Sequence, residues 1–119
     1  MRCLAALLVL SVLGCGDPAG EGTLLLGWTF VDGRRCAESG AERVVLTRPG
    51  RYEVLAESDC PAGFGVATLE VVLSGGAQEL QLTALSGSES PLYRGTFALV
   101  LSPGTTVDRV VELAFVGGF

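Results

Sequence analysis

The stretch TLLLGWTFV, residues 23–31, places its largest side chains at every second position. In an extended chain Leu24, Leu26, Trp28 and Phe30 share one face, while threonine and glycine dominate the other. A period of two residues is typical of a β-strand with one buried face. We therefore expect a strand here, with Trp28 packed in the core rather than exposed as a platform for stacking on a sugar.

The same period recurs along the rest of the chain, between turns rich in glycine, proline and serine. The dipeptide Pro49-Gly50 suits a hairpin turn, because proline fixes φ and glycine permits positive φ. Six further strands are expected, at 42–48, 51–58, 64–73, 78–85, 92–101 and 105–116. The residues expected to face the core are Val44, Leu46, Tyr52, Val54, Ala56, Ala67, Leu69, Val71, Leu73, Leu80, Leu82, Ala84, Phe97, Leu99, Leu101, Val111, Leu113 and Phe115.

Seven short strands over residues 23–119, without helical periodicity, indicate a single all-β domain. We expect a seven-stranded antiparallel Greek-key β-sandwich. A small closed barrel is the alternative that the pattern leaves open.

An apolar run, residues 4–13, follows Arg2 and ends just before Gly14-Cys15. A basic residue, a short apolar segment and a small residue are the parts of a secretory signal peptide. Ten helical residues rise only about 15 Å, half of a membrane's hydrocarbon core, so this run is a poor transmembrane span. We expect residues 1–14 to be a helical signal peptide that is removed. An ordinary secreted protein with an unmodified cysteine is the alternative.

The tetrapeptide VLGC, residues 12–15, resembles the lipobox of bacterial lipoproteins, in which a small residue precedes the cysteine. The resemblance implies cleavage between Gly14 and Cys15. It also implies a diacylglycerol on the Cys15 thiol and an acyl chain, such as palmitate, on the new amino terminus. This covalent lipid is the only non-protein group that we expect.

The residues after Cys15 predict how the mature chain is organised, and the lipobox resemblance implies its destination. Residues 15–22 would be a lipidated flexible tether, because GDPAGEG after the cysteine has no apolar anchor, and residues 23–119 would be the domain. Gly16, rather than an aspartate, follows the cysteine. This implies the outer membrane of a bacterial cell envelope, with the domain on either its periplasmic or its surface face.

The chain as a whole resembles a group of small bacterial lipoproteins that export one immunoglobulin-like or transthyretin-like sandwich. The residues that carry this resemblance are GWTF and GRRC, the segment DCPAGFGVATL, and the strand LYRGTFALVL. What it implies is mainly the fold. For function it implies no more than a structural or binding module at the envelope.

Two cysteines remain once Cys3 leaves with the signal peptide and Cys15 carries lipid. Cysteine pairs in exported proteins usually form disulfides, so we expect Cys36 and Cys60 to be bridged. A zinc site is a poor alternative, because the chain has neither a CxxC motif nor a histidine.

The composition argues against several classes of function. Thirteen acidic residues against eight basic ones give a net charge of −5, which is unfavourable for binding nucleic acid. A chain without histidine cannot form a Ser-His-Asp or Cys-His relay. We therefore expect no enzyme and no metal site. The remaining enzymatic alternative would use carboxylates alone, at Glu57 with Asp59 or at Asp32 with Glu38.

One loop is a candidate binding site. SGSESPLY, residues 86–93, resembles the Ser-Gly-Ser loop of outer-membrane lipoproteins that inhibit lysozyme. The resemblance implies that this loop contacts an envelope protein, a secreted enzyme or a glycan; a flexible hairpin loop without such a role is the alternative. The residues of the candidate loop are Ser86, Gly87, Ser88, Glu89 and Ser90. Nothing in the sequence specifies the ligand.

Overall fold

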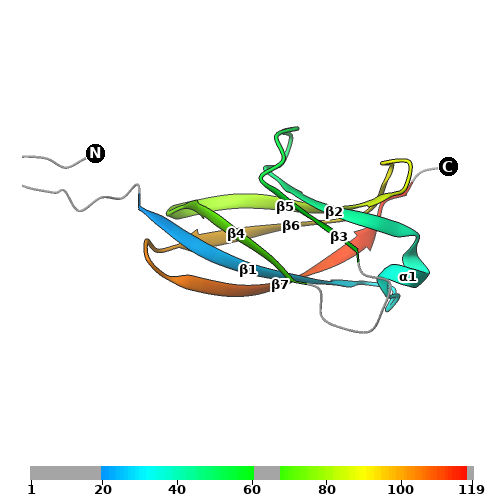
Figure 1. Cartoon of the computed structure of the whole chain (residues 1–119), viewed down its shortest axis with the longest axis horizontal. Helices are drawn as coiled ribbons and strands as arrows, with labels where there is room; N and C mark the ends of the chain where they lie inside the picture. The colour runs from blue at the N-terminus through cyan, green and yellow to red at the C-terminus, as the bar shows by residue number, and fades with distance from the viewer. Residues whose placement is uncertain (1–19, 61–67, 118–119) are drawn as a thin grey trace, which may run out of the picture.

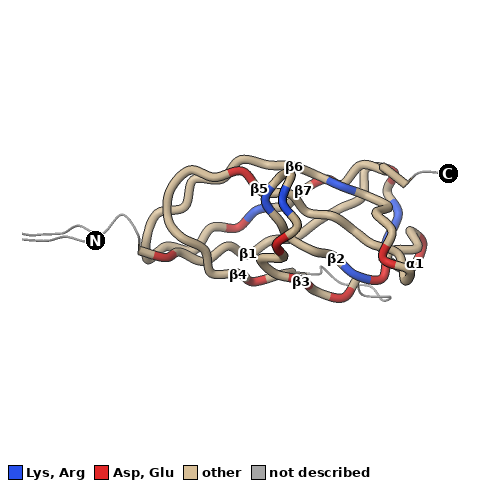
Figure 2. Tube along the Cα trace, turned by 90° about the horizontal axis from the view of Figure 1, so that it is seen from above, with Lys and Arg blue, Asp and Glu red and all other residues tan. Residues whose placement is uncertain are grey.

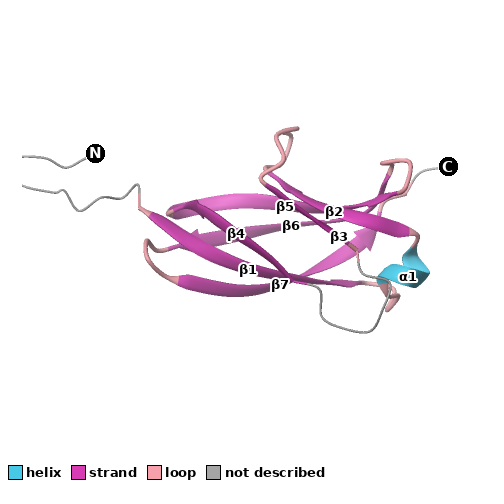
Figure 3. Cartoon of the chain, in the orientation of Figure 1, coloured by secondary structure: helices cyan, strands magenta, loops and turns pink. Residues whose placement is uncertain are grey.

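The computed structural model describes residues 20–60 and 68–117, which form seven β-strands and one short helix (Figure 3). The expected signal peptide and Cys15 lie outside these residues. The elements are β1 (Glu21–Phe30), α1 (Cys36–Ser39), β2 (Ala41–Thr47), β3 (Ala56–Asp59), β4 (Thr68–Ser74), β5 (Gly76–Ser86), β6 (Pro91–Leu101) and β7 (Thr106–Phe115). The prediction of an all-β chain is confirmed for the described part.

The strands pair in the order β3-β2-β5-β6-β7-β1-β4. All neighbouring strands are antiparallel except β1 and β7, which run parallel from Thr23 beside Thr106 to Phe30 beside Leu113. The expectation of a wholly antiparallel arrangement is therefore wrong at this one pairing. Local alternation gives the face that each strand buries but not the direction of a partner more than 70 residues away.

The sheet curls until its two edge strands, β3 and β4, lie near each other, so it is almost closed. In Figure 1, β5 and β6 form the upper layer and β1 and β7 the lower one. The two layers join where β6 pairs with β7 at only two positions, Tyr93 beside Phe115 and Arg94 beside Ala114. Beyond this junction β7 leaves β6 and pairs with β1 instead.

The core between the layers is formed by the expected alternation. Buried positions that were predicted are Leu24, Leu26, Trp28, Phe30, Val44, Leu46, Leu69, Val71, Leu73, Leu80, Leu82, Ala84, Leu99, Leu101, Val111 and Leu113. Ala56 and Phe97 are partly buried against this core. Ala67 lies outside the described residues. Trp28 is only 8% exposed, so its assignment to the core is confirmed.

Three residues expected in the core are exposed: Tyr52 at 99%, Val54 at 46% and Phe115 at 51%. The expected hairpin pairs only from Leu46 and Ala56 onward, so the strand predicted at 51–58 is reduced to β3. The connection around Pro49-Gly50 projects beyond the body of the domain (Figure 1), where alternating side chains have no second layer to pack against.

Gly95 follows the two paired positions of β6 and lies close to the backbone of β7. A Cβ added at Gly95 would lie 2.7 Å from the carbonyl oxygen of Glu112 and 2.8 Å from Cγ1 of Val111. Farther along the diverging strands, Arg109 donates hydrogen bonds to the carbonyl of Ala98 at 3.0 and 2.5 Å and lies over the ring of Phe97. This side chain bridges the two strands after their ladder has ended.

Changing Gly95 to alanine is expected to lower the free energy of unfolding by about 2 kcal/mol, because the added methyl group meets a backbone carbonyl and the buried side chains of Val111 and Leu113. Thr96→Ala is the matched control, since Thr96 is the exposed neighbour on the same strand, and it should change stability by less than about 0.5 kcal/mol. Denaturant unfolding of both variants measures the difference. Equal midpoints for the two variants would contradict a close crossing at Gly95.

Candidate functional site: the disulfide end of the domain

The two ends of the domain differ in construction. At the end where β1 begins, Gly20 accepts a hydrogen bond from the amide of Gly75 and Glu21 accepts one from the amide of Gly104, both at 2.8 Å. The chain therefore enters the domain between two turns. A Cβ on Gly75 would lie 2.9 Å from the carbonyl oxygen of Gly20, so this close approach favours glycine. We call this the tether end.

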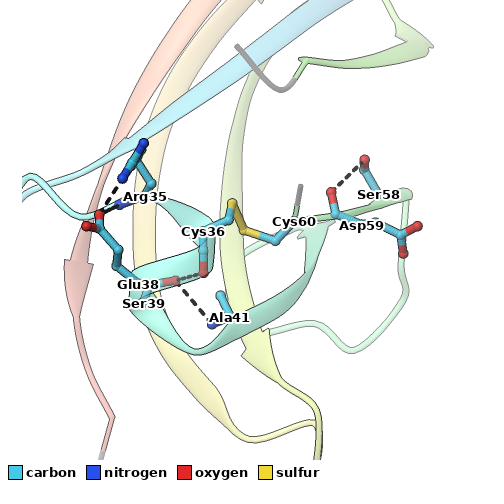
Figure 4. The surroundings of a disulfide bond; sticks show 8 residues. All are labelled: Arg35, Cys36, Glu38, Ser39, Ala41, Ser58, Asp59 and Cys60. Carbon is cyan, nitrogen blue, oxygen red and sulfur yellow. Dashed lines mark hydrogen bonds and ion pairs between the residues drawn. A yellow bond between two sulfur atoms is a disulfide. The ribbon is translucent and has the colours of Figure 1, made fainter. Parts of the chain in front are cut away.

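The opposite end contains the disulfide, and we call it the disulfide end. Cys36 at the start of α1 is bonded to Cys60 just after β3, with 5.5 Å between their Cα atoms (Figure 4). The predicted pairing of these two cysteines is confirmed. The amide of Cys60 also donates to the carbonyl of Glu42 at 2.9 Å, so β2 holds the same segment by its backbone.

Hydrogen bonds among its own and adjacent residues stabilise the helix α1. The amide of Arg35 donates to Glu38 Oε1 at 2.8 Å, while the hydroxyl of Ser39 donates to the carbonyl of Cys36 and accepts from the amide of Ala41. The Arg35 amide, followed by the Arg35 side chain, lowers the pKa of Glu38. Gly40 then ends the helix with φ of +81°. This exposed single turn has a defined conformation.

A depression of about 460 Å³ lies beside the disulfide. Its apolar part comes from Ala37, Ala41 and the disulfide, and Glu42 and Asp59 add two carboxylates. Figure 4 shows the Asp59 carboxylate directed away from the sulfur atoms. Neither carboxylate has a side-chain partner among the described residues.

The candidate loop Ser86 to Ser90 also lies at this end, because Ser86 pairs with Ala41 at the start of β2. Ser86 exchanges backbone hydrogen bonds with Glu89 and Ser90, and its hydroxyl lies 2.9 Å from that of Ser88. Glu89, with φ of +67°, binds Arg43 at 2.8 Å. The loop is thus a compact hydrogen-bonded turn. Its proposed role in binding stays a prediction.

In the two carboxylate pairs considered from the sequence, Glu57 with Asp59 and Asp32 with Glu38, the partners have different surroundings. Glu57 binds Arg43 at 2.5 Å, whereas Asp59 lies at the depression. Asp32 accepts from the hydroxyl of Tyr93, whereas Glu38 caps α1. In the described ranges, no three Asp, Glu, Cys or His side chains gather as a metal site would require.

Sequence reasoning missed the pair formed by Tyr93 and Asp32. Tyr93 is 1% exposed, and its hydroxyl donates to Asp32 at 2.7 Å. Its ring packs against those of Phe30 at 4.5 Å and Phe115 at 5.4 Å. Burial, and then the Asp32 carboxylate, raise the pKa of Tyr93, while the Tyr93 hydroxyl is the main cause that lowers the pKa of Asp32. Alternation could have placed Tyr93 in the core, because it has the same parity along its strand as Phe97 and Leu99, but it could not have identified Asp32 as its partner.

Comparison with known proteins finds no family model and no curated protein that matches this chain. In the described part of the chain, no helix has both the length and the apolar character needed to cross a membrane.

Proposed function

We propose that this protein is a lipoprotein of a bacterial envelope, cleaved before Cys15 and anchored by lipid on that residue, which displays a non-enzymatic binding or structural module. The observation that carries the proposal is the apolar run 4–13 ending at Gly14-Cys15. Several acyl chains on one cysteine hold a protein durably, because each buried methylene adds about 0.8 kcal/mol of membrane affinity. The outer membrane is the proposed destination.

The tether end is well suited to such an anchor. Gly20 is five residue steps along the chain from Cys15, and an extended chain of that length spans at most about 18 Å. β1, with ten residues, would then extend about 33 Å from that point. On this proposal the tether end stays close to the lipid surface and the disulfide end projects away from it, as a surface for a protein or glycan partner.

We further propose that the nearly closed sheet is a Greek-key sandwich related to immunoglobulin-like or transthyretin-like domains, and that residues 1–14 form the helical signal peptide. The short β6–β7 junction supports two layers, because two paired positions leave most of both strands to separate partners. The absence of histidine in the sequence supports a role without nucleophilic catalysis. Nucleic acid is not a proposed partner of this acidic chain.

A second candidate function is inhibition of a secreted enzyme, such as a lysozyme, or glycan binding through the loop Ser86 to Ser90. The observation that favours it is the order of the loop, since a turn already held by internal hydrogen bonds loses little conformational entropy on binding. Lysozyme inhibition and a glycan-binding screen, each repeated with residues 86–91 replaced by glycine, test this function. Absence of saturable binding in both assays would remove it.

The variant Cys15→Ser is expected to incorporate no fatty acid and to keep residues 1–14, because the serine hydroxyl does not accept the diacylglycerol that precedes cleavage. Labelling with a radioactive fatty acid and the intact mass of the protein measure both effects. Cys3→Ser is the matched control and should be lipidated and cleaved as the wild type is. A Cys15→Ser protein with acyl label and the mature mass would overturn the proposal.

A further inference from the structure

The connection between β2 and β3 exposes side chains that a soluble domain usually covers. Tyr52 is 99% exposed and Val54 is 46% exposed, and Arg51 beside them is also exposed. In Figure 1 this connection rises from the body of the domain. Tyrosine and arginine are the residue types that most often dominate the energy of protein interfaces. We call Arg51, Tyr52 and Val54 the knob.

The base of the knob is already ordered. The amide of Arg51 donates to the carbonyl of Arg48 at 3.0 Å across the Pro49-Gly50 turn, and Gly50 has φ of +75°. The Arg48 guanidinium donates to Gln78 Oε1 on β5 at 3.2 Å. A projection held in this way loses little conformational entropy on binding. Arg51 itself has no side-chain partner among the described residues.

The same chain has a surface of complementary chemistry. The depression at the disulfide end, here called the socket, is lined by the apolar side chains of Ala37 and Ala41, by the disulfide, and by the carboxylates of Glu42 and Asp59. The tyrosine and valine of the knob suit the apolar lining, and Arg51 suits the carboxylates. Figure 2 shows acidic and basic segments interspersed over the domain, so broad attraction between faces of opposite sign is not available and pairing must be local.

We propose that the knob of one copy binds the socket of a second copy of this chain, in a head-to-tail contact. Knob and socket lie at opposite ends of the β2–β3 hairpin. The six residue steps of extended chain from Glu42 to Arg48 separate them by about 20 Å, so the knob of one molecule cannot reach its own socket. A contact between two different surfaces leaves each dimer with one free knob and one free socket, so repeated association gives a chain or a ring.

The contact is expected to be weak in dilute solution. One inserted loop buries less than the roughly 1,600 Å² of a standard stable interface. The contact between knob and socket does not require the lipid anchor. Confinement of the chains to a surface would strengthen the association, because it raises their effective concentration.

A single lysine provides a sharp test, because the chain contains none. A water-soluble carbodiimide joins an amine to a contacting carboxylate as an amide and carries away the elements of water as a urea. The full chain with Arg51→Lys is expected to give a ladder of covalent dimers and trimers. Mass spectrometry of the dimer should find the introduced amine linked to Glu42 or Asp59. The wild-type chain, which has no lysine, measures the background of cross-links formed by the amino terminus.

Arg34→Lys is the matched control. Its side chain is 58% exposed, and the nearest carboxylate is Asp32 of the same molecule, so it should give no ladder above background. Adding Glu42→Gln and Asp59→Asn to Arg51→Lys should reduce the ladder at least tenfold. A ladder equal to that of the control, or one linked to other carboxylates, would overturn the inference.

A mixing experiment tests the direction of the contact. Tyr52→Ala and Asp59→Arg remove a knob and a socket, respectively, at exposed positions where folding does not depend on the side chain. Each variant alone should associate roughly tenfold or more weakly than wild type in sedimentation equilibrium. An equal mixture should form dimers but no larger species, since it supplies one intact knob and one intact socket per pair. Unchanged association of either variant would refute the contact, whatever the outcome of the Cys15→Ser experiment.

Discussion

A variant with both Cys36 and Cys60 changed to alanine should lose about 3.5 kcal/mol of unfolding free energy. The bridge closes a loop between residues 24 apart in sequence, and cross-linking such a loop removes that much entropy from the unfolded chain. For a small domain this is a large share of the total stability. Guanidinium unfolding, followed by tryptophan fluorescence from the buried Trp28, measures the loss.

The buried Cys60 side chain also contributes packing, so the control keeps both sulfur atoms. Wild-type protein unfolded with and without a reducing agent should show most of the same difference. If oxidised and reduced protein unfold at the same denaturant concentration, the bridge stabilises the domain little. The backbone hydrogen bond from Cys60 to Glu42 and the pairing of β2 with β3 would then hold the segment that contains Cys60.

The alternation of side chains identified most of the core because each strand meets the interior through one face. In β1 and β4 the predicted inward positions are the buried ones, from Leu24 to Phe30 and from Leu69 to Leu73. Alternation wrongly predicted that Tyr52 is buried, because the hairpin continues past the second layer there. Alternation reports the conformation of a segment, while burial also requires a partner surface that local sequence does not reveal.

The direction of β1 beside β7 was beyond sequence reasoning for a related reason. Strand direction depends on how the whole chain curls, and here two layers share the β6–β7 junction at Tyr93 and Arg94. Gly95 was a local sign of this junction, since a glycine inside a strand often marks a close backbone approach. Its partner on β7, however, could be identified only in three dimensions.

Only part of the candidate site could be predicted from the sequence. The pairing of Cys36 with Cys60 followed from counting cysteines, and the structure brings the loop Ser86 to Ser90 to the same end as the disulfide. The depression beside the disulfide was missed, because it combines α1 with residues from β2 and β3. The contact between Asp32 and Tyr93 was missed because 61 residues separate them.

The variant Tyr93→Ala should lose about 4 kcal/mol of unfolding free energy, which is the usual cost of deleting a fully buried aromatic side chain. The ring fills the space between Phe30 on β1 and Phe115 on β7, so its removal opens the core at the junction of the two layers. Leu92→Ala is the matched control on the same strand, because Leu92 is only partly buried, and it should lose clearly less. Thermal and guanidinium unfolding measure both variants.

The variant Tyr93→Phe keeps the aromatic ring and removes the hydroxyl. The pH dependence of its stability therefore measures what the hydroxyl contributes. The hydroxyl lowers the pKa of Asp32 below the ordinary value of 3.8 in the folded protein, so the unfolded state binds the proton more readily. The stabilisation is therefore present above pH 4 and is lost as the pH falls through the lowered pKa. Wild type should be more stable than Tyr93→Phe at neutral pH, and the gap should narrow below pH 4. A gap that stays constant down to pH 2 would mean that the hydroxyl does not stabilise the Asp32 carboxylate.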